Sequence, residues 1–207
     1  MRYRPITAGL AAAAACTVAA AYCAWVRPWV MTWGATEDEV AAKLPGDELL
    51  PGADGIATRA ITIDAPPAAV YPWLAQMGPS PPRGGAYTYD WIENLLGLDM
   101  HSTDRVLEEY QHPAVGDTIG HGAEALPDRD RRTRPRVRHP YGRRRLGVVV
   151  HAGPGRQSTR LISRNRFRLP GLGKKLAMIP MEPGSLIMER KMLQGIKERA
   201  EALAHAE

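Results

Sequence analysis

Two carboxylates in the segment 83–105 have a spacing that suits chemistry. Asp90 and Glu93 are three residues apart and form a candidate pair for general acid–base catalysis. The same spacing is typical of a helix capping box, with Asp90 at the N-cap and Glu93 three residues later. We favour the capping role, and the catalytic role stays open as the alternative.

A glycine pair and three aromatic residues of the same segment are candidates for ligand binding. Arg83 precedes Gly84 and Gly85, a pattern that suits either a backbone nest for an anion or a simple glycine turn. Each aromatic side chain combines an apolar ring with a polar atom, which suits the mouth of a pocket or a packed core. These aromatic residues are Tyr87, Tyr89 and Trp91.

A small polar site is also conceivable at His101, Asp104 and Arg105, although ordinary surface residues have the same composition. No Gly-x-Ser-x-Gly motif accompanies them, and both cysteines, Cys16 and Cys23, lie in an apolar N-terminal run. The sequence has no CxxC motif of the kind that holds zinc. We therefore expect no catalytic residue, no metal and no cofactor, and we favour a binding protein over an enzyme.

Length and composition set the frame for these candidates. The chain has 207 residues, of which 44% are hydrophobic, and this suits one ordinary globular domain. The net charge of +5 is unevenly distributed: residues 31–120 hold 4 basic and 14 acidic side chains, whereas residues 121–157 hold ten arginines and three acidic side chains. Because the basic excess comes largely from one short segment, we do not expect a nucleic-acid partner.

The N-terminal region has the length and composition of a membrane anchor. Residues 6–26 carry no charge and would rise about 31 Å as a helix, enough to cross a bilayer. Tryptophans at 25, 29 and 33 suit an interfacial belt. Arg2 and Arg4 precede the span, so we expect residues 1–30 to form a single-pass anchor in the cell membrane, with a cytoplasmic N-terminus and an extracytoplasmic C-terminal domain. A cleaved signal peptide and a cytosolic Ala-rich helix are the alternatives.

The remaining chain predicts an α+β domain over residues 57–204, preceded by a linker over 31–56 in which Thr36 caps a short helix. β-branched alternation favours strands, and apolar residues at helical spacing favour helices. We expect strands at 57–63, 146–150 and 159–169, and helices at 66–77, 90–96 and 183–204.

The last helix and the last strand carry the clearest face patterns. The helix has one apolar stripe, from which Glu189 is expected to be excluded. This stripe comprises Leu186, Met192, Leu193, Ile196, Ala200 and Leu203. Arginines alternate along one face of the strand at 160, 164, 166 and 168, and we expect that face to be solvated.

Several blocks of the sequence resemble the SRPBCC (START-like) superfamily, which includes polyketide cyclases and lipid-transfer domains. Residues 59–78 (RAITIDAPPAAVYPWLAQMG) resemble its opening strand and helix. Further blocks are similar to one membrane-associated branch of the superfamily. These blocks are 33–40 (WGATEDEV), 44–49 (LPGDEL), 83–97 (RGGAYTYDWIENLLG), 159–164 (TRLISR) and 181–192 (MEPGSLIMERKM).

The resemblance implies a helix-grip fold, in which a curved antiparallel sheet holds a long C-terminal helix above an apolar cavity. It implies a membrane-anchored domain that binds a hydrophobic small molecule or lipid. We expect the ligand to contact Arg83, Tyr87, Tyr89, Trp91, Glu93 and His101. A polyketide cyclase or dehydratase-like enzyme is the first alternative that the family permits.

Residues 121–157 depart from this resemblance. Within them, residues 123–145 contain nine arginines and three prolines, and nine positive charges cannot face a core. We favour the hypothesis of an out-of-frame translation, which the other two reading frames of the coding DNA would test. The alternative is a natural basic loop, which would act as an electrostatic adaptor for anionic lipid or nucleic acid. Under both interpretations we expect residues 121–145 to be poorly ordered.

Overall fold

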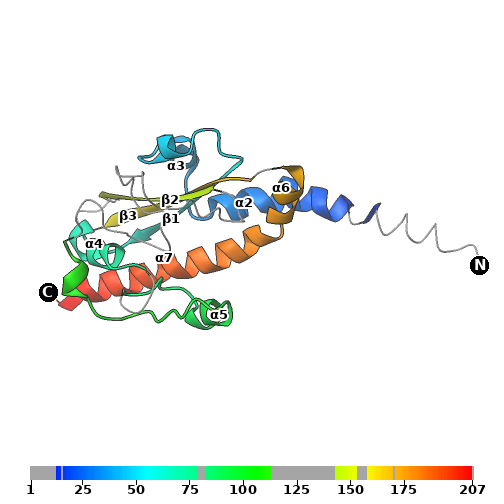
Figure 1. The fold of residues 1–207 in the computed structure, drawn as a ribbon. Helices are drawn as coiled ribbons and strands as arrows, with labels where there is room; N and C mark the ends of the chain where they lie inside the picture. Colours follow the sequence, from blue (N-terminus) through cyan, green and yellow to red (C-terminus); the bar gives the residue numbers. More distant parts are fainter. Residues whose placement is uncertain are drawn as a thin grey trace, which may run out of the picture.

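A sheet packed against a long C-terminal helix forms the centre of the fold. A second helix leads away from this centre at the N-terminus (Figure 1). This arrangement confirms the predicted α+β class. The computed structural model describes residues 13–14, 16–78, 83–112, 143–152, 158–169 and 171–206, with the backbone alone for 143–152.

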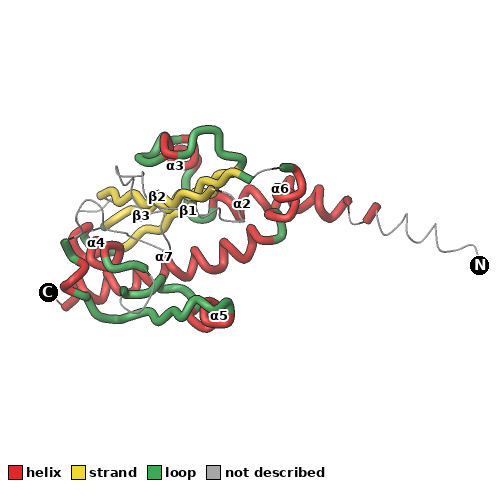
Figure 2. Tube along the Cα trace, viewed as in Figure 1, coloured by secondary structure: helices red, strands yellow, loops and turns green. Residues whose placement is uncertain are grey.

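The sheet in the described part of the chain has three antiparallel strands in the order β1-β3-β2 (Figure 2). Its central strand is β3, in which Ser163 is paired with Arg59 on one side and Val148 on the other. The bounds are β1 (Gly55–Ile63), β2 (Arg143–Ala152) and β3 (Thr159–Arg168). All three predicted strands are confirmed.

Strand β2 begins earlier than the sequence predicts. Residues 143–145 belong to it, and their backbone pairs with residues 166–168 of β3. The expectation of poor order stays a prediction for these three residues. Pairing with β3 occupies the backbone hydrogen-bonding groups whatever the side chains are, and composition alone did not reveal this. Residues 121–142, the rest of that expectation, lie outside the described residues.

Helix α7 (Met181–Ala206) packs against one face of the sheet and confirms the predicted last helix. Leu193, Ile196 and Ala200 are fully buried and share one core cluster with Ile63 and Leu161 of the sheet. The predicted apolar stripe of α7 is therefore the face that the sheet and helix α4 (Pro67–Ala75) cover. The exclusion of Glu189 from that face is wrong, because this side chain is buried.

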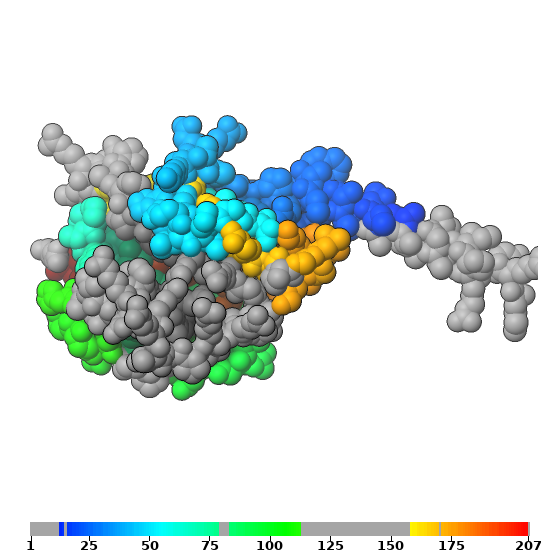
Figure 3. Space-filling view, turned by 45° about the horizontal axis from the view of Figure 1, so that its top comes forward, coloured from blue at the N-terminus to red at the C-terminus, as the bar shows by residue number. Residues whose placement is uncertain are grey.

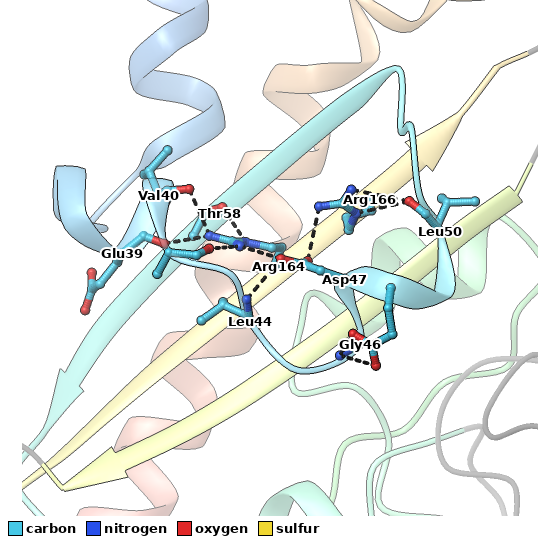
Figure 4. Close-up of polar contacts among 11 residues, drawn as sticks. Glu39, Val40, Leu44, Gly46, Asp47, Leu50, Thr58, Arg164 and Arg166 are labelled. Atoms are coloured by element: carbon cyan, nitrogen blue, oxygen red, sulfur yellow. Dashed lines mark hydrogen bonds and ion pairs between the residues drawn. The ribbon is translucent and has the colours of Figure 1, made fainter.

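The opposite face of the sheet is covered by the segment 36–54, which includes α3 (Glu37–Ala41) and the 3₁₀ turn η2 (Asp47–Leu49). Arg164 donates hydrogen bonds to Thr58 Oγ1 (3.0 Å) and to Asp47 Oδ2 (2.9 Å) (Figure 4). Its guanidinium also donates to the carbonyls of residues 39, 40 and 42. The prediction of a solvated face is therefore wrong at Arg164, where these carbonyls and the Asp47 carboxylate replace water, whereas Arg168 at the end of the strand is exposed as predicted.

Two neighbouring arginines of β3 also form ion pairs with carboxylates of the segment 36–54. Arg160 pairs with Glu39 at 2.7 Å, and Arg166 pairs with Asp47 at 3.2 Å. Thr36 caps α3 as predicted, and Glu39 completes the capping box by accepting from the Thr36 backbone at 2.8 Å. The expected linker segment thus forms a layer of its own over the outer face of the sheet.

In the described part of the chain between β1 and β2, there are two α-helices. Helix α4 (Pro67–Ala75) follows β1 and confirms the predicted helix, with Val70 and Trp73 in the core. Helix α5 (Asp90–Leu95) confirms the second one, and the 3₁₀ turn η3 (Glu108–Tyr110) follows it. The predicted capping box at Asp90 is wrong, because its carboxylate accepts hydrogen bonds from Ser102 instead.

The described N-terminal residues form one continuous helical rod. Residues 16–21 are helical, followed by η1 (Tyr22–Val26) and α2 (Arg27–Thr32), and the rod leads out of the domain (Figure 3). Among the described residues no helix is both long and apolar enough to cross a membrane, although residues 6–12 and 15 of the predicted span are not described. Trp33 does not join an interfacial belt with Trp25 and Trp29, because it packs against the core cluster.

Candidate ligand-binding site

A pocket of about 540 Å³ lies between α4, the C-terminal half of α7 and the segment that flanks α5. Its apolar side chains come from both helices, from Tyr87 and from Val106. Its polar side chains come from α7 and from the segment 88–104. The lining residues are Trp73, Tyr87, Thr88, Ser102, Asp104, Val106, Lys191, Glu198, Arg199, Ala202 and Leu203.

Two aromatic rings form the buried part of this pocket. Trp73 and Tyr87 meet edge to face, with ring centroids 6.2 Å apart and an interplanar angle of 82°. The Tyr87 hydroxyl donates to the Trp73 carbonyl at 3.1 Å, which holds the two rings together. Burial raises the pKa of Tyr87 to about 12, so the phenol is neutral and the aromatic floor is uncharged at physiological pH.

Tyr87 adopts a left-handed backbone conformation, with φ at 57°. Its backbone N–H donates to Ser102 Oγ at 3.0 Å, and the Ser102 hydroxyl donates to Asp90 at 2.7 Å. A β-carbon on Gly195 of α7 would lie 2.7 Å from the Tyr87 carbonyl oxygen. Tyr87 is therefore held between the hydrogen-bonded loop and α7, which can approach it closely because Gly195 has no side chain.

The wall at Val106 is attached to α4 by Gln76. This fully buried side chain donates to the carbonyl of Arg105 at 3.0 Å and accepts from the N–H of Leu107 at 2.8 Å. Both hydrogen bonds lie next to a pocket-lining residue, and they fix the distance between the wall and the aromatic floor.

The rim of the pocket carries two cations and two carboxylates. Arg199 lies 4.7 Å from the centroid of the Tyr87 ring and pairs with Asp104 at 2.5 Å. Lys191 and Glu198 form a longer pair at 3.9 Å. Both carboxylates are mostly exposed, whereas the two cations extend further into the protein. The rim therefore combines positive donors near the pocket with negative groups toward solvent.

Two polar atoms of the lining residues are buried without a hydrogen-bond partner. These are the indole Nε1 of Trp73 and the hydroxyl Oγ1 of Thr88. A buried unsatisfied donor costs about 1–3 kcal/mol, so such groups in a native protein call for a partner. The indole N–H can only donate, and because neither atom is exposed to the pocket, a ligand would reach them only if the surrounding side chains moved.

A different arrangement fills the space between the sheet and the N-terminal half of α7. Arg59 of β1 is fully buried there and pairs with Glu189. Ser163 donates to the same carboxylate at 2.7 Å and Asn165 at 2.9 Å. The pocket beside this network has a volume of only about 50 Å³, below the 300–1,000 Å³ that is typical of small-molecule sites.

The structure places the six predicted ligand-contact residues in different surroundings. Tyr87 lines the large pocket. Arg83 does not line it: its guanidinium donates to the carbonyl of Ala75 and lies 4.5 Å from the ring centroid of Tyr110. Glu93 is buried with Oε2 unpartnered, but it does not line the large pocket. The other three are exposed: these are Tyr89, Trp91 and His101.

Sequence reasoning did not single out the pocket residues that α4 and α7 supply. Trp73 lies within the predicted helix 66–77, and neither it nor Lys191 or Arg199 is among the candidate site residues that the sequence indicates. Only the tertiary fold brings these residues to the segment 87–106. Within the described residues, no group of three or more His, Cys, Asp and Glu side chains is arranged to hold a metal ion.

Comparison of the chain with protein-family models, with curated proteins and with solved structures finds no match. The functional argument therefore depends on the geometry of the pocket and on the residue patterns.

Proposed function

We propose that this protein is a membrane-anchored helix-grip domain that binds a hydrophobic or amphiphilic small molecule or lipid. The observation that carries the proposal is the pocket of about 540 Å³ with its Trp73–Tyr87 floor. Its volume lies within the range of small-molecule sites, and its lining combines apolar side chains with six polar or charged ones, which suits an amphiphilic ligand.

The fold class agrees with the resemblance to the SRPBCC superfamily. An antiparallel sheet packed against a long C-terminal helix is the core of a helix-grip domain, and this supports the proposal without establishing it. The proposed ligand site differs from the site that the resemblance implies. It lies on the side of α7 that faces α4 and the segment 87–106, whereas Arg59 and Glu189 occupy the space beneath the other half of the helix.

A membrane anchor is the second part of the proposal. Residues 16–20 and 23–26 are exposed in the structure and carry no charge. An exposed apolar surface of this kind is typical of a segment that contacts a membrane or another protein. Introducing a charge with Val18→Arg should weaken insertion, because arginine at the centre of a span costs about 2.5–3.5 kcal/mol. We expect the native chain in the carbonate-resistant membrane fraction and this variant largely in the supernatant. Glu198→Arg, in the distant domain, is the control.

The proposed binding is tested by isothermal titration of the detergent-exchanged protein with dodecanoate and with dodecanol. Ala202→Trp places an indole in the pocket, and we expect it to weaken binding at least tenfold. Ala206→Trp, one turn further along α7 and absent from the pocket lining, is the matched control and should bind as the native chain does. Absence of saturable binding, or equal affinities for both variants, would overturn the proposal.

No specific observation favours either alternative function. Glu93 and His101, the candidate general acid or base residues, do not line the large pocket, so a cyclase-like enzyme stays a prediction. The electrostatic adaptor also stays a prediction, since most of the arginine-rich segment lies outside the described residues.

A further inference from the structure

A short helix before α7 exposes an apolar face that the ligand site does not use. In α6 (Leu172–Met178), Leu172 is 71% exposed and Leu176 is 57% exposed. The two residues are four apart, so their side chains share one face of the helix. Met181, at the start of α7, is 62% exposed. Exposed leucines are ordinary, and α5 exposes a similar group with Trp91 and Leu95, so it is the position of the α6 group that sets it apart.

This apolar group lies where the N-terminal helix leaves the domain. Figures 1 and 3 both place α6 beside that helix. Arg27 binds Glu182 through two nitrogens, with Nε to Oε2 at 2.8 Å and Nη2 to Oε1 at 2.8 Å, which fastens the helix to the first turn of α7. Met178 of α6 packs against the cluster that contains Met31 of α2. The position of α6 relative to the N-terminal helix is therefore set by side-chain contacts.

The N-terminal helix contributes two more exposed apolar side chains at this end. Trp25 is 78% exposed and Trp29 is 55% exposed, and they are again four residues apart. Tryptophan is enriched where a membrane meets water, because its ring is apolar and its N–H seeks a polar partner. Residues 171–178 also contain Lys174 and Lys175, of which Lys175 is paired with Asp54 at 2.7 Å, so the apolar side chains, and not the charge of this segment, indicate the bilayer.

We propose that Trp25, Trp29, Leu172, Leu176 and Met181 together form a membrane-facing end that lies on the phospholipid bilayer. The inference rests on the proposed anchor and adds that α6 is a second, interfacial contact. A bilayer is the occupant that the chain itself indicates, because residues 16–26, a described part of the uncharged run 6–26, leave the domain at this end. Two contacts would fix how the domain is oriented over the membrane, which one flexible tether would not do.

The test uses full-length protein in vesicles of phosphatidylcholine and phosphatidylglycerol that contain a nitroxide-labelled lipid. Cys16→Ser and Cys23→Ser remove the native thiols, and single cysteines for a bimane label are introduced by Leu172→Cys, Leu176→Cys or Leu95→Cys. Leu95, on α5, is 80% exposed and serves as the matched control. All three sites are exposed, so the variants should melt at the native temperature, and this is checked first.

We expect the nitroxide lipid to quench the labels at 172 and 176 at least threefold more strongly than the label at 95. Equal quenching at the three sites in vesicle-bound protein would overturn the membrane-facing end and leave the anchor standing. Disulfide cross-linking between two unlabelled Leu172→Cys copies, in protein whose labelled form is not quenched, would overturn it in favour of self-association. Protein that remains in the supernatant would overturn both this inference and the anchor.

Discussion

Arg59 of β1 and Glu189 of α7 form a salt bridge in the interior of the domain, where their side chains are only 1% and 7% exposed. The remaining hydrogen bonds of the pair go to Ser163, Ser185, Asn165 and the carbonyl of Val30. The network therefore connects the sheet, α7 and the end of α2. Such a pair has no net advantage over apolar packing, but its removal from one side is costly.

Replacing Glu189 alone should strongly destabilise the protein. Glu189→Ala leaves the Arg59 guanidinium buried without a counter-charge, and we expect a loss of about 3–5 kcal/mol in the free energy of unfolding. Urea denaturation measures this loss. Glu198→Ala on the exposed side of the same helix is the control and should change stability by less than about 0.5 kcal/mol. The double variant Arg59→Met/Glu189→Leu should recover most of the loss, and a double variant as unstable as the single one would contradict this account.

Two glycines of α7 should respond in opposite ways to alanine. At Gly195 a β-carbon would meet the Tyr87 carbonyl oxygen at 2.7 Å and the Tyr87 β-carbon at 2.9 Å, so Gly195→Ala must displace α7 or the strained residue. We expect a destabilisation of about 1–3 kcal/mol. At Gly184 a β-carbon meets nothing within 4 Å, and Gly184→Ala should stabilise by up to about 1 kcal/mol through helix propensity. Thermal melts of the pair test this, and equal shifts would refute the close approach.

The layer over the outer face of the sheet should weaken in acid. Hydrogen bonds from Arg160 lower the pKa of Glu39 below its ordinary value of 4.5. Burial opposes a similar change at Asp47, but the N–H of Leu44 and the Arg164 guanidinium outweigh it, so the pKa of Asp47 also lies below its ordinary 3.8.

Since both folded pKa values are depressed, the stabilisation is complete above about pH 5 and is lost as the pH falls through those values. Urea midpoints measured between pH 5 and pH 2.5 should therefore fall, and they should fall less steeply in Glu39→Gln than in the native chain. Glu37→Gln, at an exposed residue of the same helix, is the control. An unchanged acid slope in Glu39→Gln would contradict the assignment.

Tyr87 should give a stability change at the alkaline end. Burial raises its pKa to about 12, and the charge of Arg199 offsets part of that rise. Because the folded pKa lies above the ordinary 10.0, the contribution is fully present below pH 10 and is lost between about pH 10 and pH 12. We expect Tyr87→Phe to remove this part of the alkaline transition, with absorbance at 295 nm reporting the late-titrating phenol. Tyr71→Phe at a half-exposed residue is the control.

Periodicity predicted most of the individual elements, because a helix or strand face is a local property. The stripe of α7, the alternation of β3 and the Thr36 cap of α3 all depend on residues that lie near one another in the sequence. Charge placement was predicted poorly. Arg164 and Glu189 were assigned to solvent because a charge on a regular face is usually hydrated, and nothing local indicated that Asp47 or Arg59 would face them.

The candidate site divides in the same way. Tyr87 was expected at a ligand site from its neighbours in the segment 83–97, and it lines the pocket. Trp91 and His101 are candidates on the same grounds of residue type and position, yet both are exposed and do not line the pocket. Lys191 and Arg199 are ordinary charges of a long helix until the hydrogen bonds of Gln76 and Asp90 bring the segment 87–106 against it.

By itself the amino-acid sequence determined the α+β class, the order of helices and strands and the uncharged N-terminal run, since each follows from the polarity and backbone preference of consecutive residues. Only the tertiary structure decided which charges are buried together, where the pocket lies and which apolar side chains stay uncovered. These outcomes depend on contacts between residues more than one hundred positions apart, such as Arg27 with Glu182 and Arg59 with Glu189, and no local pattern encodes such pairings.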